Sequence, residues 1–257
     1  MREFRWLMHL RVINMGRFGS LLKRMISENH LSPSLIRRYP VVDELGVREA
    51  YRLWASTYAT ETVTCSLDEE LARTMLRGLP QTRLLDAGCG IGRRIQNIPN
   101  AIGMDLIPGT LAAGRAHNVV IGDIRAMPFE SNCFDMIWCR LVLGYLPDLL
   151  LAYGEIFRVC RPGGYVFITD FHPDAAAAGH LRTLTDEEGT VHAIEHFVHG
   201  DHVQLAVDAG LSFVAHCDGA VGPSVRDFYI RGLGLKAYKR DVSLKLVVAF
   251  LFRKPGV

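Results

Sequence analysis

Short apolar runs alternate with segments of helical periodicity through the middle of the chain. The runs are rich in Leu, Ile, Val and Phe and end at an acidic residue or a turn, as buried strands do. Strand and helix alternate through Asp170, which predicts an α/β fold with a doubly wound, mostly parallel sheet. The predicted strands are Arg83–Asp86, Ala101–Asp105, Val119–Asp123, Phe134–Cys139, Tyr165–Asp170, Leu211–Cys217 and Leu244–Arg253.

Apolar residues at spacings of three and four predict helices between and around these strands. A further helix is expected to begin near Ile91, directly after a glycine-rich turn. The other predicted helices are Val47–Tyr58, Leu67–Leu79, Leu149–Val159, Val203–Gly210 and Val225–Lys239.

The stretch from Leu84 to Arg93 is the most informative part of the sequence. Glycines at alternate positions suit a tight strand-to-helix turn, because glycine tolerates positive φ and lets a ligand approach the backbone. Arg93 stands where a dinucleotide fingerprint has its third glycine. Asp86 lies inside the turn, where its charge repels a pyrophosphate and suits a ligand that carries an amino group and a sulfonium. A redox enzyme that uses a nicotinamide is therefore disfavoured.

Two more acidic residues end later strands of the predicted sheet. Asp105 falls where a carboxylate at the end of a second parallel strand can bind both hydroxyls of a ribose. Asp123 ends the third strand and can face the exocyclic amine of an adenine, with Ile124 along the ring. The three acids therefore predict one adenosine-type site at the carboxyl ends of the strands.

The sequence resembles the class I S-adenosylmethionine-dependent methyltransferase family. The resemblance implies a Rossmann-like seven-stranded sheet, mostly parallel with an antiparallel last strand, that holds S-adenosylmethionine and releases S-adenosylhomocysteine. It also implies that Tyr58, in an aromatic helix, contacts the methionine part of the donor. The matching stretches are Leu84–Arg93, Gly103–Leu106, Gly122–Ile124, Met127–Phe129, Phe134–Trp138 and Arg158–Asp170.

These arguments give one set of expected cofactor contacts and one of catalytic candidates. The loop Arg140–Leu146 follows the fourth strand, where ligands bind in such sheets. Histidine has an unperturbed pKa near 6.5, which suits removal of a proton from an acceptor. The expected cofactor-binding residues are Tyr58, Asp86, Gly88, Cys89, Gly90, Asp105, Leu106, Asp123, Ile124 and Arg140. The catalytic candidates are His172, His196 and Tyr145; an alternative for each is a purely packing or hydrogen-bonding role.

Composition narrows the class of protein. A net charge of +2 gives no argument for a nucleic-acid surface. The six cysteines lack close paired spacing, which favours reduced thiols in a cytoplasmic protein. Four histidines crowd between positions 192 and 202, but the alternating pattern there predicts a strand that separates His199 from the others, so no metal site is predicted.

The chain divides at residue 45 in this interpretation. Residues 1–45 are a basic, partly apolar helical extension, and residues 46–257 are the methyltransferase domain, with an acceptor wall or lid at about 171–202. Two alternatives stay open for residues 1–39: contact with a membrane surface, or packing on the domain or on a second subunit of a homodimer.

The expected function is transfer of a methyl group to an O, N or C atom of a small-molecule acceptor. Two alternatives remain: a carrier-bound or lipid-like acceptor of quinone or fatty-acyl type, and a non-catalytic subunit that binds the donor.

Overall fold

A seven-stranded sheet forms the centre of the computed structural model, which describes residues 41–54, 62–186 and 188–256. Its strands are β2 (Leu84–Ala87), β3 (Ile102–Asp105), β4 (Val119–Ile121), β5 (Phe134–Arg140), β6 (Cys160–Phe171), β9 (Ser212–Ala220) and β10 (Lys245–Arg253). Their order is β4-β3-β2-β5-β6-β10-β9. The first five are mutually parallel, and β10 is antiparallel to both of its neighbours. The predicted α/β sheet with an antiparallel last strand is confirmed.

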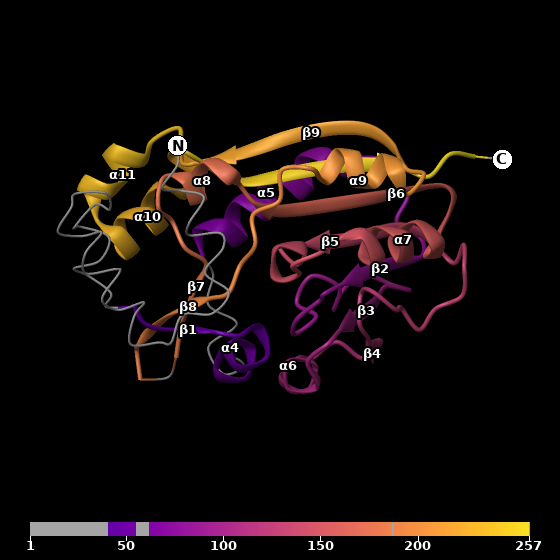
Figure 1. Ribbon diagram of the computed structural model, residues 1–257, viewed down its shortest axis with the longest axis horizontal. Coiled ribbons are helices and arrows are strands. Elements are labelled where there is room, and N and C mark those ends of the chain that lie inside the picture. Colours follow the sequence, from indigo (N-terminus) through magenta and orange to yellow (C-terminus); the bar gives the residue numbers. More distant parts are fainter. Residues whose placement is uncertain (1–40, 55–61, 187, 257) are drawn as a thin grey trace.

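Helices cover both faces of this sheet (Figure 1). One face carries α5 (Val63–Met75), α8 (Pro173–Ala177), α10 (Arg226–Leu233) and α11 (Leu235–Asp241). The other carries α7 (Leu150–Val159) and α9 (His202–Asp208). Successive strand residues alternate between the two cores, as the period of two requires: Leu84 packs with α5, and Leu85 packs with α7.

The chain leaves β2 to form β3 on one side and later returns to form β5 on the other side. In open α/β sheets the crevice at such a switch point, outside the carboxyl ends of the strands, is where ligands bind. The topology therefore selects the ends of β2, β3 and β5 as the place to look for a site.

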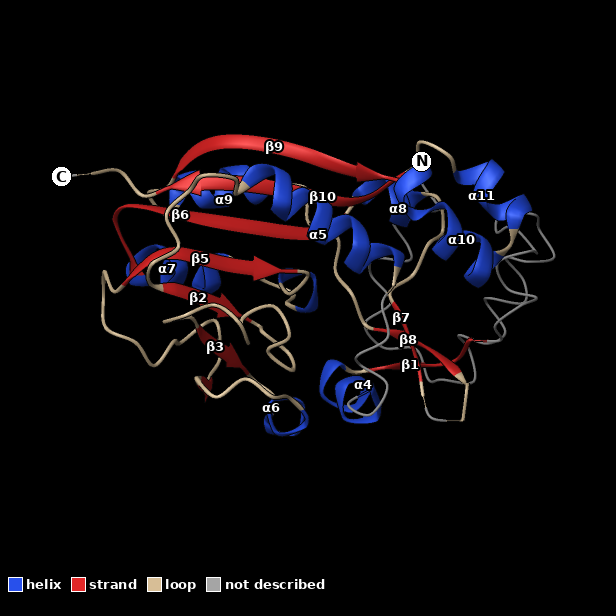
Figure 2. Cartoon of the chain, turned by 180° about the vertical axis from the view of Figure 1, so that it is seen from behind, coloured by secondary structure: helices blue, strands red, loops and turns tan. Residues whose placement is uncertain are grey.

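A second, three-stranded sheet lies beyond these strand ends. It consists of β1 (Val41–Leu45), β8 (Val191–Ile194) and β7 (Thr183–Thr185), with β1 parallel and β7 antiparallel to β8. Helix α4 (Val47–Trp54) follows β1, and Figure 2 shows the arrowheads of β2 and β5 pointing toward this part of the molecule. The segment expected to form an acceptor wall thus contributes two of the three strands.

Two helix predictions were wrong in detail, and glycine explains both. No helix begins near Ile91: the chain turns through residues 91–100, with single-turn hydrogen bonds such as Ile95 N to Gly92 O at 3.1 Å. Gly92 has φ +70°, which a right-handed helix does not accommodate. The helix predicted over Val225–Lys239 is divided into α10 and α11 at Gly234, where φ is +86°.

Several predictions fall on residues outside the described ranges. These are residues 1–40 of the predicted extension, the end of the aromatic helix and Tyr58 within it. The described end of that extension, residues 41–45, was predicted to be helical but forms strand β1, which pairs with β8. Within the described ranges, every helix is too short or too polar to cross a bilayer.

Candidate functional site

A cavity of about 520 Å³ opens at the carboxyl ends of β2, β3, β4 and β5. Its volume falls within the range of about 300–1,000 Å³ that is common for small-molecule sites. The expected cofactor contacts that line it are Gly88, Cys89, Asp105, Leu106, Asp123, Ile124 and Arg140. The structure therefore brings together seven residues from the ends of four strands, whereas the expected contacts Asp86 and Gly90 do not line the cavity.

The glycine turn forms one wall of the cavity. Gly88 has φ +83° and Gly90 has φ +58°, conformations that residues with a Cβ rarely adopt. A Cβ on Gly88 would lie 2.3 Å from a methyl carbon of Val142, which follows β5. The amides of Gly88 and Cys89 donate to the carbonyl of Met104 on β3, at 2.7 and 3.0 Å. The turn is thus held by backbone contacts to the neighbouring strand.

Asp86 is a buried carboxylate without a hydrogen bond. Its side chain is fully buried at the end of β2, and neither oxygen has a hydrogen-bond partner among the described residues. Burial raises its pKa above the ordinary range, although the charges of Arg94 and Arg140 partly offset this effect. A buried carboxylate in this state is costly unless a cation or a donor group compensates it.

Asp105 and Asp123 lie at the next two strand ends. Asp105 accepts hydrogen bonds from the backbone N–H of Gly90 at 2.8 Å and of Ile107 at 3.0 Å, which fix the carboxylate at the cavity wall. Burial raises the pKa of Asp105, and these backbone donors partly offset the increase. Asp123 instead forms an ion pair with Arg125 at 2.6 Å. Each oxygen of Asp105 accepts one of these backbone hydrogen bonds and keeps a further acceptor position, whereas each oxygen of Asp123 accepts two hydrogen bonds from Arg125.

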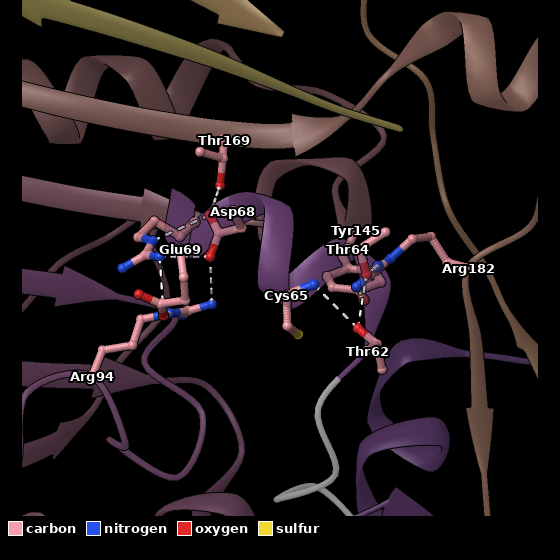
Figure 3. Close-up of polar contacts among 10 residues, drawn as sticks. Thr62, Thr64, Cys65, Asp68, Glu69, Arg94, Tyr145, Thr169 and Arg182 are labelled. Atoms are coloured by element: carbon pink, nitrogen blue, oxygen red, sulfur yellow. Dashed lines mark hydrogen bonds and ion pairs between the residues drawn. The ribbon is translucent and has the colours of Figure 1, made fainter. Parts of the chain in front are cut away.

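Arg140 lines the cavity, but its guanidinium is already paired with Asp68, which Figure 3 shows beside Glu69 and Arg94. Its Nε and Nη2 donate to the two oxygens of Asp68 at 3.2 and 2.7 Å, and Glu69 lies 3.1 Å from Nη2. Arg94 donates to the same Asp68 at 3.1 Å, and Thr169 does so at 2.6 Å. The side chain of Arg140 is therefore part of a buried ionic cluster based on α5.

Tyr145 and His196 lie together, and Tyr145 lines the cavity. Their rings pack edge to face with centroids 5.5 Å apart. The imidazole Nε2 of His196 lies 3.4 Å from Asp170 at the end of β6, and a Cβ on Gly144 would collide with the ring. Burial alone would raise the pKa of Asp170, but His196 and His202 outweigh it and hold this pKa well below its usual range. His196 is thus oriented by a carboxylate and covered by Tyr145.

Neither His196 nor His172 lines the cavity itself, and His172 is placed differently from His196. It caps α8 by accepting a hydrogen bond from Asp174 N at 3.0 Å, and its other ring nitrogen lies 3.5 Å from Asp218. Burial lowers its pKa. Of the two candidate histidines, only His196 is in contact with a residue of the cavity wall.

The remaining histidines of the 192–202 group have separate partners. His192 pairs with Asp186 at 2.7 Å, His199 is hydrogen-bonded to the carbonyl of Leu146, and His202 contacts Tyr153 and Asp170. Across the described part of the chain, no three potential metal ligands of the His, Cys, Asp or Glu type come together.

Two residues at the site were not anticipated from the sequence. Asp68 is fully buried and neutralises two arginines, and Arg182 enters the cavity wall from the segment before β7. Asp68 lies on the face of α5 that carries Leu67, Leu71 and Ala72, so a charge on an apolar helical stripe was the available signal. Nothing in the local sequence distinguishes Arg182 from a surface arginine.

The chain is similar to known methyltransferases. A family model described as a methyltransferase domain matches residues 85–168. Malonyl-[acyl-carrier protein] O-methyltransferase of Salmonella typhimurium is 31% identical over 136 residues, which cover 50% of this chain and 54% of that protein. 24-Methylenesterol C-methyltransferase 2 of Oryza sativa is 28% identical over 204 residues, which cover 71% of this chain and 56% of that protein.

The chain spans about half the length of the curated relatives it matches. Among solved structures, N-methyltransferase NodS from Bradyrhizobium japonicum, in complex with S-adenosyl-L-homocysteine, superposes with a TM-score of 0.57 at 15% identity. That superposition covers 82% of this chain and all of the other (100%), and it shows a shared fold.

Proposed function

Because residues 85–168 form a domain of the class I S-adenosylmethionine-dependent methyltransferase family, we propose that the protein transfers a methyl group from this donor to a small-molecule acceptor. The single observation that carries the proposal is the cavity at the strand ends. It brings the glycine turn, Asp105 and Asp123 together beside the orphaned carboxylate of Asp86.

The residues present fit the donor's chemical groups. Asp86 does not itself line the cavity; its buried negative charge, two positions before Gly88 of the cavity wall, is the group that we assign to the amino group of the donor. Asp105 has acceptor capacity for the ribose hydroxyls, and Asp123 with Ile124 suits the adenine. In this proposal Cys89, Gly90 and Leu106 contribute backbone and apolar contacts, and Arg140 contributes its backbone, since its guanidinium is held by Asp68.

When bound, the donor supplies a methyl group that its sulfonium has already activated. The protein then has to place the acceptor and exclude water, which can account for much of the rate. Tyr145 is the described residue best placed to orient an acceptor, since it lines the cavity beyond β5. For an acceptor that must lose a proton, His196 is the candidate base, held by Asp170 behind Tyr145. His172 has no comparable contact with the cavity wall.

A carrier-bound or lipid-like acceptor is the second candidate. The relatives named above act, by their names, on an acyl carrier protein substrate and on a sterol. The cavity continues past the strand ends to Arg182, directly before β7, and Glu195, directly after β8, which leaves room for an extended acceptor.

Calorimetric titration with S-adenosylmethionine, S-adenosylhomocysteine and NADH tests which of these compounds the protein binds, and therefore the identity of the donor. We expect micromolar binding of the two adenosyl compounds and none of NADH. Binding of NADH alone, or of none of the three, would overturn the proposal. If both adenosyl compounds bind but no acceptor in a broad screen is methylated, the non-catalytic alternative gains support.

Asp105→Ala tests the ribose contact. We expect S-adenosylhomocysteine to bind more weakly by about 1.5–3 kcal/mol, the usual size of a hydrogen bond to a charged group. Asp148→Ala, at an exposed carboxylate before α7, serves as the control. An unchanged affinity of the Asp105 variant would remove Asp105 from the donor site.

The affinity for S-adenosylhomocysteine should also depend on pH. Burial raises the pKa of Asp86 in the free protein, and a bound ammonium group would lower it again. Binding is therefore coupled to loss of a proton, and affinity should fall as the pH decreases through the raised pKa, by at most about tenfold per pH unit. Titrations across an acidic pH series measure this slope. A slope of zero, or affinity that rises in acid, would contradict the role given to Asp86.

A further inference from the structure

Among the arginines that line the cavity, Arg94, Arg140 and Arg182 come from different parts of the fold and have different surroundings; Figure 3 shows Arg94 and Arg182. Arg94 and Arg140 are both paired with Asp68 and Glu69, with N–O distances between 2.7 and 3.4 Å. Arg182 lies on the other side of α5, close to Tyr145 and Thr64. The first two guanidinium groups are thus neutralised within the protein.

Arg182 has only neutral partners among the described residues. Its Nη1 donates to the hydroxyl of Thr64 at 2.9 Å, and its Nη2 donates to the hydroxyl of Tyr145 at 3.3 Å. The residue is half-buried and lines the cavity. Removing a cation partly from water without a counter-charge is costly, and a guanidinium has five N–H donors, more than these two contacts use.

The surroundings of Arg182 also favour a negative charge. Thr64 lies in the first turn of α5, a helix of 13 residues with no acidic side chain in that turn. The N-terminal end of a helix attracts anions through its partial positive charge.

We propose that Arg182, with the hydroxyls of Tyr145 and Thr64, forms a subsite for a carboxylate of the acceptor. The planar fork of a guanidinium matches a carboxylate with two parallel hydrogen bonds, and the phenol can donate a third. The subsite lies beyond the end of β5, on the other side of α5 from Arg94. This inference rests on the proposed function and narrows its acceptor to a molecule that carries a carboxylate.

Binding of matched acids and amides tests the subsite. The probes are hexanoate, benzoate and the N-acetylcysteamine thioesters of malonate and glutarate, each paired with its primary amide and titrated into protein saturated with S-adenosylhomocysteine. We expect at least one acid to bind about tenfold or more tightly than its amide. Arg182→Gln should abolish that preference, Arg182→Lys should retain part of it, and Arg77→Gln, at an exposed arginine after α5, should leave it unchanged.

Three results would overturn the inference. In the first, no acid is preferred over its amide. In the second, the preference survives in Arg182→Gln. In the third, Arg182→Gln weakens the binding of S-adenosylhomocysteine itself, which would mean that Arg182 binds the carboxylate of the donor. Failure of the proposed function is a separate observation, because the wild-type protein would then not bind S-adenosylhomocysteine before any acid is added. Melting temperatures of all variants show whether a loss reflects unfolding.

Discussion

Replacing Asp86 with asparagine is expected to weaken S-adenosylhomocysteine binding by about 10- to 100-fold while leaving the unliganded protein at least as stable as the wild type. The carboxylate is fully buried at the end of β2 and has no hydrogen-bond partner among the described residues. In the free protein its charge is a cost, as the raised pKa indicates. In the complex the same charge would face the amino group of the ligand. Asparagine has nearly the same shape without the charge, so it removes both the cost of the buried charge in the free protein and its attraction to the amino group in the complex.

The two effects are measured separately, by calorimetry for affinity and by thermal unfolding for stability. Asp135→Asn is the matched control, because Asp135 is a buried carboxylate at the opposite end of β5 whose oxygens accept hydrogen bonds from Arg83 N at 3.1 Å. That variant should bind S-adenosylhomocysteine normally. If Asp86→Asn bound as tightly as the wild type, the buried charge would need another explanation; a large loss of stability without ligand would show that Asp86 is structural.

Replacing Asp68 with asparagine is expected to destabilise the protein by about 3–5 kcal/mol, the usual penalty for removing one partner of a buried ion pair. Asp68 is fully buried and accepts hydrogen bonds from Arg140, Arg94 and Thr169. Burial alone would raise its pKa, but the charges of Arg140 and Arg94 outweigh this and lower the pKa. The amide would leave Arg140, whose side chain is 2% exposed, without its main counter-charge.

Urea unfolding at neutral pH measures the loss, and a second variant separates charge from packing. Asp68→Leu combined with Arg140→Met removes both charges and should recover part of the lost stability. A stability change below about 1 kcal/mol for Asp68→Asn would place the pair among weak surface ion pairs. The folded-state pKa of Asp68 is lowered, so its contribution should be full above the unfolded-state pKa of about 3.9 and disappear as the pH falls through the folded-state value.

Asp68 also affects the surroundings of Asp86, which we propose to be part of the donor site. Arg94 and Arg140 exert their charge on both Asp68 and Asp86. Because Asp68 accepts the hydrogen bonds of both arginines, Asp86 is left without any. The pairing on α5 therefore keeps the carboxylate at the end of β2 available for a ligand cation.

The sequence by itself determined the sheet and the position of the cavity. Apolar runs that end in Asp86, Asp105 and Asp123 specify parallel strands whose carboxyl ends meet at one edge, and the observed strand order places these ends together. Such information is local, because the period of a strand and the residue at its end can be read from a few neighbouring positions. The helix expected near Ile91 was wrong because it was inferred from the glycine-rich turn, and the positive φ of Gly92 is a backbone property that the residue types do not report.

The tertiary structure alone decided which polar groups are neutralised and which are left for a ligand. Arg140 finds Asp68 across 72 positions, and Arg182 finds Thr64 across 118, while β1 joins β8 to form the second sheet. These pairings depend on strand order and on which side chains reach one place in space, and residue spacing does not encode either. The sequence does not show whether a charged residue has an ion-pair partner, has no hydrogen-bond partner, or has only neutral hydrogen-bond partners. Only the fold separates Arg140, Asp86 and Arg182 into these three states.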